Sequence, residues 1–192
     1  MKKFELTNEF ITNMFGTKLF RIRALVEFGD VEAGELGGYV EKESNLGHDD
    51  NAWVYDNAWV YGDAQVSGDA QVSGDALVYD NARVYGDAQV SGDARVCGNA
   101  RVYGDARVCG NGDYAYAHGF GSVNRTTTFF RLKDGGVGVR CGCFYGTLAQ
   151  FRDKIRETHG ESAIAEEYLD LAALMEKRFR RTGNEQKTEE ES

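Results

Sequence analysis

Basic and hydroxyl side chains gather in residues 111–146, which hold four basic and two acidic residues and so carry a formal charge of +2. The whole chain is acidic, with a formal net charge of -9. The run Arg125-Thr126-Thr127-Thr128 offers guanidinium and hydroxyl donors, which suit a phosphate or a carboxylate. We therefore predict that residues 118–145 of this segment form a site for an anionic small molecule, such as a nucleotide. The predicted site residues are Arg125, Thr126, Thr127, Thr128, Phe129, Arg131, Lys133, Arg140 and Tyr145.

Aromatic side chains in the same segment supply a wall for such a site. Phe129, Phe130, Phe144 and Tyr145 would line a pocket for a base or another ring. The alternative interpretation is structural: a capping β-hairpin whose arginines pair with the acidic body of the protein. The residues leave both interpretations open.

Metal chemistry has weaker support in the sequence. The spacing of Cys141-Gly142-Cys143 differs from the Cys-x-x-Cys of zinc sites, and Cys97 and Cys109 fall on different faces of the repeat. Stacked aspartates in the repeat would suit Ca²⁺, but aspartate also suits a tight corner that holds no ion. We predict four free thiols, no metal and no cofactor.

A six-residue repeat precedes residues 111–146 and must position the side chains of that segment. Ten valines recur every six residues from Val54 to Val108, and each follows an alanine by two residues. Asp or Asn stands before each alanine, and Gly or Asp stands before that residue. A unit of six residues is too short to bury its own valine, so the units must stack on one another. Three units make one triangular coil, so residues eighteen apart lie in neighbouring rungs.

The repeat predicts which side chains point inward. Valine faces the axis, alanine lies at a corner, and the residues that flank valine point outward. Gly, Asp and Asn suit corners that need left-handed backbone. Trp59, Tyr61, Leu77 and Tyr79 then form one apolar patch, and such patches usually mark contact surfaces. We therefore predict homo-oligomerisation through these four residues.

Other segments cap the coil. Asp134-Gly135 between two β-prone runs predicts a hairpin. Thr147 and Gln150 fit a capping box at the start of one helix, and Ser162 can begin a second helix. The last residues are acidic and lack large apolar side chains, which predicts disorder. We predict five segments: an irregular N-terminal cap (1–45), the repeat array (46–110), a β-extension with a hairpin (111–146), a helical cap (147–181) and a disordered tail (182–192). The N-terminal cap contains one predicted strand, over residues 19–25.

The composition excludes two classes of partner. A net charge of -9 opposes binding to nucleic acid or to an anionic membrane, because both need a basic protein surface. The sequence shows no run of eighteen apolar residues and no signal peptide, so we expect a cytoplasmic protein.

The repeat resembles the hexapeptide-repeat, left-handed β-helix superfamily, in the variant of the YdcK-type transferases. The resemblance rests on the order Val-x-Gly-Asp-Ala-Arg-Val and on the entry segment from Arg23-Ala24-Leu25 to Gly37-Gly38-Tyr39-Val40. It covers about residues 20–110 and implies a left-handed coil and a trimer of parallel prisms. Residues 125–148, with the helices that follow, resemble the tails of phage-encoded repeat proteins.

The resemblance also implies an alternative activity. Many members are acyltransferases that use acetyl-CoA and a histidine base near a subunit seam. His118 is the candidate here because it lies where the array ends, although it also fits an ordinary exit loop. No loop interrupts residues 51–110 to shape an acceptor site, and the absence of histidine there excludes the zinc site of the carbonic anhydrases in this superfamily.

We therefore predict a mainly β protein. Its fold is a short left-handed parallel β-helix of hexapeptide repeats, capped by a C-terminal β-hairpin and two α-helices. The predicted function is non-enzymatic: a homo-oligomer, with a trimer favoured, sequesters an anionic small molecule such as a nucleotide signal, in phage counter-defence. The alternatives are a CoA-dependent acyltransferase with acetyl-CoA as cofactor, and a structural or protein-interaction module.

Overall fold

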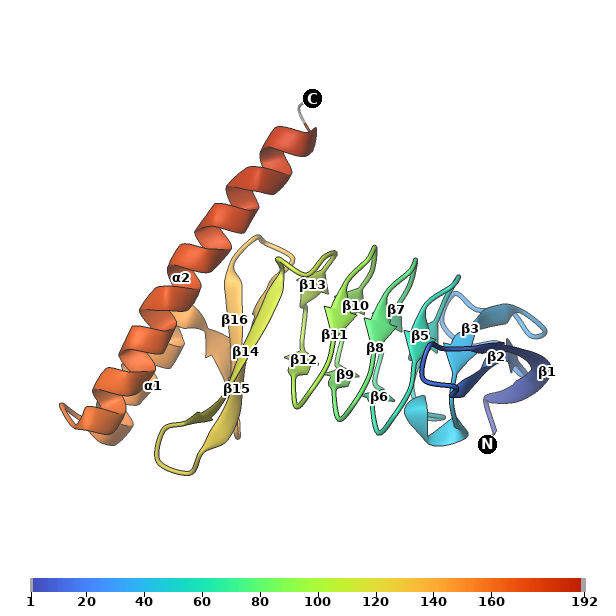
Figure 1. Ribbon diagram of the computed structural model, residues 1–192, viewed down its shortest axis with the longest axis horizontal. Helices are drawn as coiled ribbons and strands as arrows, with labels where there is room; N and C mark the ends of the chain where they lie inside the picture. The colour runs from blue at the N-terminus through green and yellow to red at the C-terminus, as the bar shows by residue number, and fades with distance from the viewer. Residues whose placement is uncertain (1, 191–192) are drawn as a thin grey trace. The chain divides into compact units, whose positions relative to one another are not determined.

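The chain folds as two compact units, residues 1–111 and 112–192. The structure is a computed structural model that describes residues 2–190, with side chains described through residue 182. Most of the first unit is a coil whose short strands follow one another as stacked turns (Figure 1). The second unit is an antiparallel sheet with two long helices packed on it (Figure 1).

Short parallel strands line the three sides of the coil. One sheet contains β4 (Trp53–Val54), β7 (Gln71–Val72), β10 (Gln89–Val90) and β13 (Arg107–Val108). A second contains β5 (Trp59–Val60), β8 (Leu77–Val78) and β11 (Arg95–Val96), and a third contains β6 (Gln65–Val66), β9 (Arg83–Tyr85) and β12 (Arg101–Tyr103). Val54 pairs with Val72 and Val60 with Val78, so residues eighteen apart are neighbours, as the repeat predicts.

The core of the coil is the predicted column of valine and alanine. The ten valines from Val54 to Val108 are at most 1% exposed, and the ten alanines from Ala52 to Ala106 are fully buried. Main-chain bonds join each rung to the next, as from Tyr55 N to the oxygen of Val72 at 2.7 Å. The left-handed coil and the hexapeptide-repeat superfamily stay predictions.

The corners explain why Gly or Asp stands two residues after each valine. Residues at this position, from Asp56 to Gly104, adopt a positive φ. Gly92 shows the steric demand most clearly, because a Cβ there would lie 2.3 Å from the main-chain oxygen of Cys109. Aspartate is accommodated because its carboxylate bonds to the next rung, as from Gly98 N to Asp80 Oδ2 at 3.1 Å.

The N-terminal segment contains more strand than the sequence predicted. The predicted strand over 19–25 is confirmed as β2 (Lys18–Ala24). It lies between two further strands, β1 (Phe4–Thr12) and β3 (Leu36–Val40), where the sequence predicts irregular structure. β3 then joins the coil in parallel, pairing Tyr39 with Trp59. A Cβ on Gly38 would lie 2.6 Å from the oxygen of Ala58, so only glycine allows this close approach.

Trp53 occupies an outward-facing position of the repeat but is covered by other residues. It is fully buried, although its position next to Val54 predicted an exposed side chain. Phe28 and Phe4 pack edge-on against its ring, with centroids at 5.3 and 6.2 Å. The N-terminal segment therefore covers the first rung on this side.

The second unit begins with a four-stranded antiparallel sheet, where the sequence predicted a hairpin. Its strands are β14 (Tyr114–Phe120), β15 (Arg125–Arg131), β16 (Val137–Cys141) and β17 (Phe144–Thr147). The predicted hairpin is confirmed as β15 and β16, whose turn is fixed by a bond from Gly136 N to Asp134 Oδ1 at 2.8 Å.

The helices follow as α1 (Leu148–His159) and α2 (Ala163–Glu190). The capping box of Thr147 and Gln150 is present at the start of α1. Phe151, Tyr168 and Phe179 pack on one face of the sheet with Phe129 and Val139, and so form the core of this unit. None of the described helices is long and apolar enough to cross a membrane.

The backbone of α2 continues past residue 181, where the predicted disordered tail was to begin, and ends at Glu190. Glu, Gln and Lys are frequent in this stretch and favour helix, so the low apolar content did not fix the helix end. Residues 191–192 lie outside the described residues.

Candidate ligand-binding site

The outward side chains of the coil form faces of different chemistry. The second face, on β5, β8 and β11, carries Trp59, Tyr61, Leu77 and Tyr79, followed by Arg95 and Cys97. The third face, on β6, β9 and β12, carries Gln65, Ser67, Arg83, Tyr85, Arg101 and Tyr103. Strand register places Gln65 opposite Arg83, and Arg83 opposite Arg101. The third face therefore has a cationic column in a protein whose net charge is -9.

Arg83 has an unfavourable neighbour and no compensating one among the described residues. Like charges that lie directly opposite each other in a sheet are destabilising, and Arg83 faces Arg101 across neighbouring rungs. The exposed guanidinium of Arg83 has no hydrogen-bond or ion-pair partner in the part of the chain that the structure describes. Its five N–H donors are therefore available to an acceptor that comes from outside the chain.

A polar pocket of about 260 Å³ opens beside Arg83. Its lining comes from the segment before the first rung, from β6 and from β9: Lys42, Ser44, Asp63, Ala64, Gln65, Asn81 and Arg83. Apart from Ala64, each of these residues carries a polar or charged side chain. The pocket can therefore offer ammonium, guanidinium, amide and hydroxyl donors to one small ligand.

Asn45 holds the far wall of this pocket in place. Its side-chain oxygen accepts from Lys42 N at 2.9 Å, and its Nδ2 donates to the oxygens of Gly62 and Ala64 at 3.0 and 2.8 Å. Asn45 is fully buried and lies in the 3₁₀ turn η1 (Glu43–Asn45). These bonds fix Lys42 and Ser44 against the first rung of the coil.

Lys42 and Asp63 are both charged at neutral pH. Lys42 Nζ donates to Asp63 Oδ1 at 2.8 Å. This hydrogen bond raises the pKa of Lys42 above its ordinary value and lowers the pKa of Asp63 below its own. The pair adds no net charge to the pocket, so Arg83 sets its sign.

Comparison with known proteins supports the architecture of this region. Four stretches match the family model of the YdcK β-solenoid repeat, over residues 52–68, 70–86, 78–92 and 94–110. The repeat region is a β-solenoid. No curated protein matches the chain. The matching description names a structural repeat, so it supports the fold of the solenoid and assigns no activity to it.

The residues predicted to bind an anion lie outside the solenoid, and they do not share one surface. Thr127, Phe129 and Arg131 lie on the side of the second unit's sheet that packs on the helices, where Thr127 and Phe129 are fully buried. Thr128, Arg140 and Tyr145 align across β15, β16 and β17, with Thr128 buried. Strand alternation thus divides the continuous run between two faces.

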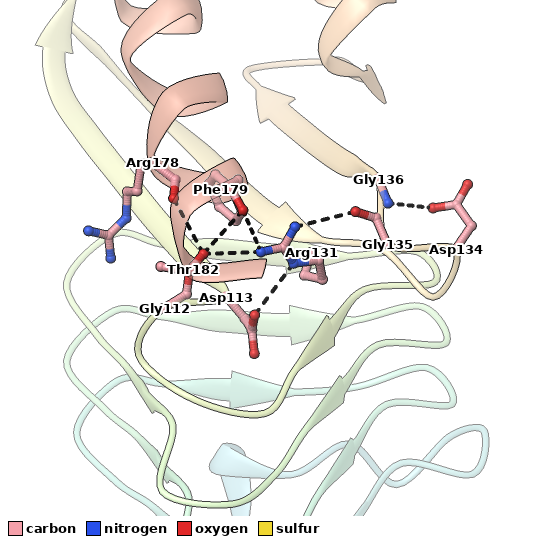
Figure 2. Close-up of polar contacts among 9 residues, drawn as sticks. All are labelled: Gly112, Asp113, Arg131, Asp134, Gly135, Gly136, Arg178, Phe179 and Thr182. Carbon is pink, nitrogen blue, oxygen red and sulfur yellow. Dashed lines mark hydrogen bonds and ion pairs between the residues drawn. The ribbon is translucent and has the colours of Figure 1, made fainter. Parts of the chain in front are cut away.

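Arg131 makes structural contacts within the second unit. Its Nη2 donates to the oxygen of Phe179 at 2.9 Å and to Thr182 Oγ1 at 3.1 Å, and its Nε lies 3.5 Å from Asp113 Oδ1 (Figure 2). Nη1 donates to the oxygen of Gly135 at 3.3 Å. Arg131 therefore ties the hairpin to α2 and to Asp113.

The other predicted residues have mixed surroundings. Arg140 Nη1 donates to the oxygens of Cys143 and Phe144 at 3.0 and 3.2 Å, and Tyr145 stacks near Phe130 with centroids at 6.5 Å. Arg125 and Thr126 are half-buried, and Lys133 is exposed. Anion binding by this segment stays a prediction.

His118, the candidate base of the acyltransferase alternative, lies on β14. It is exposed, and its Nδ1 is 2.8 Å from Thr126 Oγ1. The four cysteines are not joined in disulfides, and the described residues contain no group of three or more His, Cys, Asp or Glu side chains that could hold a metal ion.

No single sequence pattern predicts the Lys42–Arg83 pocket. The period of eighteen residues places Arg83 beside Gln65 and Arg101, so the part of the pocket that lies in the repeat could be predicted from the sequence. The other part depends on how residues 41–45 fold over the first rung, and no pattern in the sequence indicates that.

Proposed function

We propose that this chain is a non-enzymatic binding protein for an anionic small molecule, and that the ligand binds in the Lys42–Arg83 pocket. One observation carries the proposal: Arg83 lines a polar pocket, faces Arg101 in register, and has a guanidinium with no hydrogen-bond or ion-pair partner among the described residues. An anion in the pocket would offset the repulsion between the two arginines.

The donors around the pocket suit a phosphate or a carboxylate. A guanidinium presents paired N–H groups that match two oxygens of such a group. Ser44, Gln65 and Asn81 add neutral donors at its edges. This site replaces residues 118–145 as our preferred location, because Thr127, Thr128 and Phe129 are buried and Arg131 has partners inside the protein.

Binding without turnover is the better-supported form of the proposal. The described lining of the pocket contains no histidine, and the pKa of Asp63 is lowered by its hydrogen bond to Lys42. A carboxylate with a lowered pKa is a weak general base at neutral pH. Sequestration of the anion therefore fits these residues better than acyl transfer does.

Self-association through the second face remains part of the proposal, with a trimer favoured. Tyr61 and Tyr79 stack with centroids at 5.2 Å and an interplanar angle of 5°, and Trp59 pairs in register with Leu77. These half-buried side chains form one apolar surface of the kind that marks a contact between proteins.

Calorimetric titration with ribose 5-phosphate tests the binding proposal. Arg83→Ala should weaken binding about tenfold to a hundredfold, because a hydrogen bond to a charged group contributes about 1.5–3 kcal/mol. Arg95→Ala is the matched control, since Arg95 begins β11 as Arg83 begins β9 but lies on another face. Equal loss in both variants, or no binding by the natural sequence, would contradict the proposal.

A further inference from the structure

A pair of tyrosines whose rings contact each other at a tilt lies next to the arginines of the third face. Tyr85 pairs in register with Tyr103, and their rings lie 4.6 Å apart at an interplanar angle of 40°. Each tyrosine follows its arginine by two residues in the same strand, so both side chains point outward. Both rings are half-buried. The third face thus presents an aromatic column beside a cationic column.

The second face provides an internal comparison. Tyr61 and Tyr79 occupy the same position of the repeat and stack, with centroids at 5.2 Å. Their neighbours two residues earlier are Trp59 and Leu77, whereas those of Tyr85 and Tyr103 are Arg83 and Arg101. Stacked tyrosines beside apolar side chains suit a contact between proteins. Tyrosine rings beside arginines suit a ligand that carries both a ring and a charge.

We infer that the third face binds an anion that carries a planar aromatic ring, with the anionic group at Arg83 and the ring against Tyr85. This inference rests on the proposed function and names the class of ligand for the same site. Positions two residues apart in a strand are about 6.5–7 Å apart, so ring and charge must be joined by a linker of a few bonds. Nucleoside monophosphates have this arrangement.

From this spacing we expect an anion without a ring to contact Arg83 but not Tyr85. A phosphate without a ring reaches Arg83 and the donors of the pocket but leaves the face of Tyr85 exposed to water. Stacking of a base on an aromatic side chain is largely independent of the base, because every base has a π face. The ring should therefore add affinity for AMP and for UMP alike.

Three probes separate the charge from the ring in calorimetric titration: AMP, ribose 5-phosphate and adenosine, with UMP as a second base. AMP and UMP should bind the natural sequence roughly fivefold to a hundredfold more tightly than ribose 5-phosphate does. Adenosine should bind more weakly than AMP. Tyr85→Leu should bring AMP to the affinity of ribose 5-phosphate and leave the latter unchanged, whereas Tyr85→Phe should keep the preference.

Tyr55→Leu is the matched control, because Tyr55 follows Val54 as Tyr85 follows Val84 but lies on another side of the solenoid. It should keep the preference for AMP. Saturation-transfer NMR on the natural sequence gives a measurement that needs no variant. The base protons of AMP should receive more saturation than its ribose protons, because the base contacts Tyr85.

The results distinguish the two proposals. If ribose 5-phosphate binds as tightly as AMP and UMP, the ring inference is wrong and the anion proposal stands. Equal binding of adenosine and AMP overturns the coupling of ring to charge. If none of the probes binds, both proposals fail together.

Discussion

Lys3 donates from its ammonium group to the main-chain oxygen of Ala52 at 2.8 Å and to that of Asp50 at 3.2 Å. In the solenoid, the oxygens of each rung accept from the rung before, and the first rung has no predecessor. Lys3 and Asn45 replace it with side-chain donors. The main-chain N–H groups of Tyr39 in β3 and of Glu41 just after it donate to the oxygens of Ala58 and Val60. The N-terminal segment therefore completes the open end of the coil.

Lys3→Met should lower the free energy of unfolding by roughly 1–3 kcal/mol, because it leaves the buried oxygen of Ala52 without a donor. Urea denaturation measures this change. Lys2→Met is the control, since Lys2 is exposed and pairs with Glu43 at the surface, and its effect should stay within about 0.5 kcal/mol. Equal effects of both substitutions would show that Lys3 does not cap the coil.

The contribution of Lys3 should depend on pH. Burial lowers the pKa of Lys3 from 10.5 to about 8. Between these values the unfolded chain binds more protons than the folded chain, so the free energy of unfolding should rise with pH from about 8 to 10. The rise should be present in the natural sequence and smaller in Lys3→Met. Parallel pH profiles for the two proteins would contradict the lowered pKa.

Gly92→Ala should destabilise the solenoid by more than about 1 kcal/mol. The residue has a φ of +62°, and a Cβ would lie 2.3 Å from the oxygen of Cys109, so backbone strain and a clash act together. Gly34→Ala separates the two effects, because Gly34 has a φ of +91° and a Cβ added there would meet no described atom within 4 Å. The difference between the two melting temperatures reports the close approach of neighbouring rungs. No difference would mean that the rungs can move apart to admit the methyl group.

Most of the solenoid was predictable because its information is local and repeated. The valine period fixed the register, and Asp134-Gly135 and Thr147 with Gln150 marked a turn and a helix start through short-range chemistry. β3 was missed because Gly37 and Gly38 indicate a loop when they are considered alone. Their strand conformation depends on close packing against Val54 and Ala58, which only the folded structure reveals.

The candidate site was predictable only in part. The run from Arg125 to Thr128 suggested a cluster of donors, but strand alternation divides it between two faces of the sheet, and Thr127 and Thr128 are buried. The repeat placed Arg83 over Arg101, yet a clustered pair of arginines is common on protein surfaces. Its significance comes from Lys42 and Ser44, which reach the same pocket from a segment outside the repeat.

Arg131→Gln should destabilise the second unit by roughly 2–3 kcal/mol, because its charged hydrogen bonds to Phe179 and Thr182 and its ion pair with Asp113 are lost. Hydrogen exchange should become faster in α2 near Phe179. Lys133→Gln is the control, since Lys133 is exposed on the adjacent turn. Binding of ribose 5-phosphate should be unchanged in Arg131→Gln. A loss of binding there would return the anion site to the second unit.

Leu77→Asp should reduce the mass in solution to that of one chain, as measured by light scattering. Leu77 lies in register with Trp59 on one side and with Arg95 on the other, next to the stacked Tyr61 and Tyr79. A carboxylate at this position would interrupt the apolar surface and would have to lose its water when two second faces meet, which costs free energy. Leu174→Asp is the matched control, because Leu174 is an exposed leucine on α2, outside the second face. An unchanged mass in Leu77→Asp would place the contact elsewhere, and a natural sequence that is monomeric at micromolar concentration would contradict self-association. The lining of the pocket at Arg83 includes no residue of the second face, so Leu77→Asp should still bind ribose 5-phosphate with the affinity of the natural sequence.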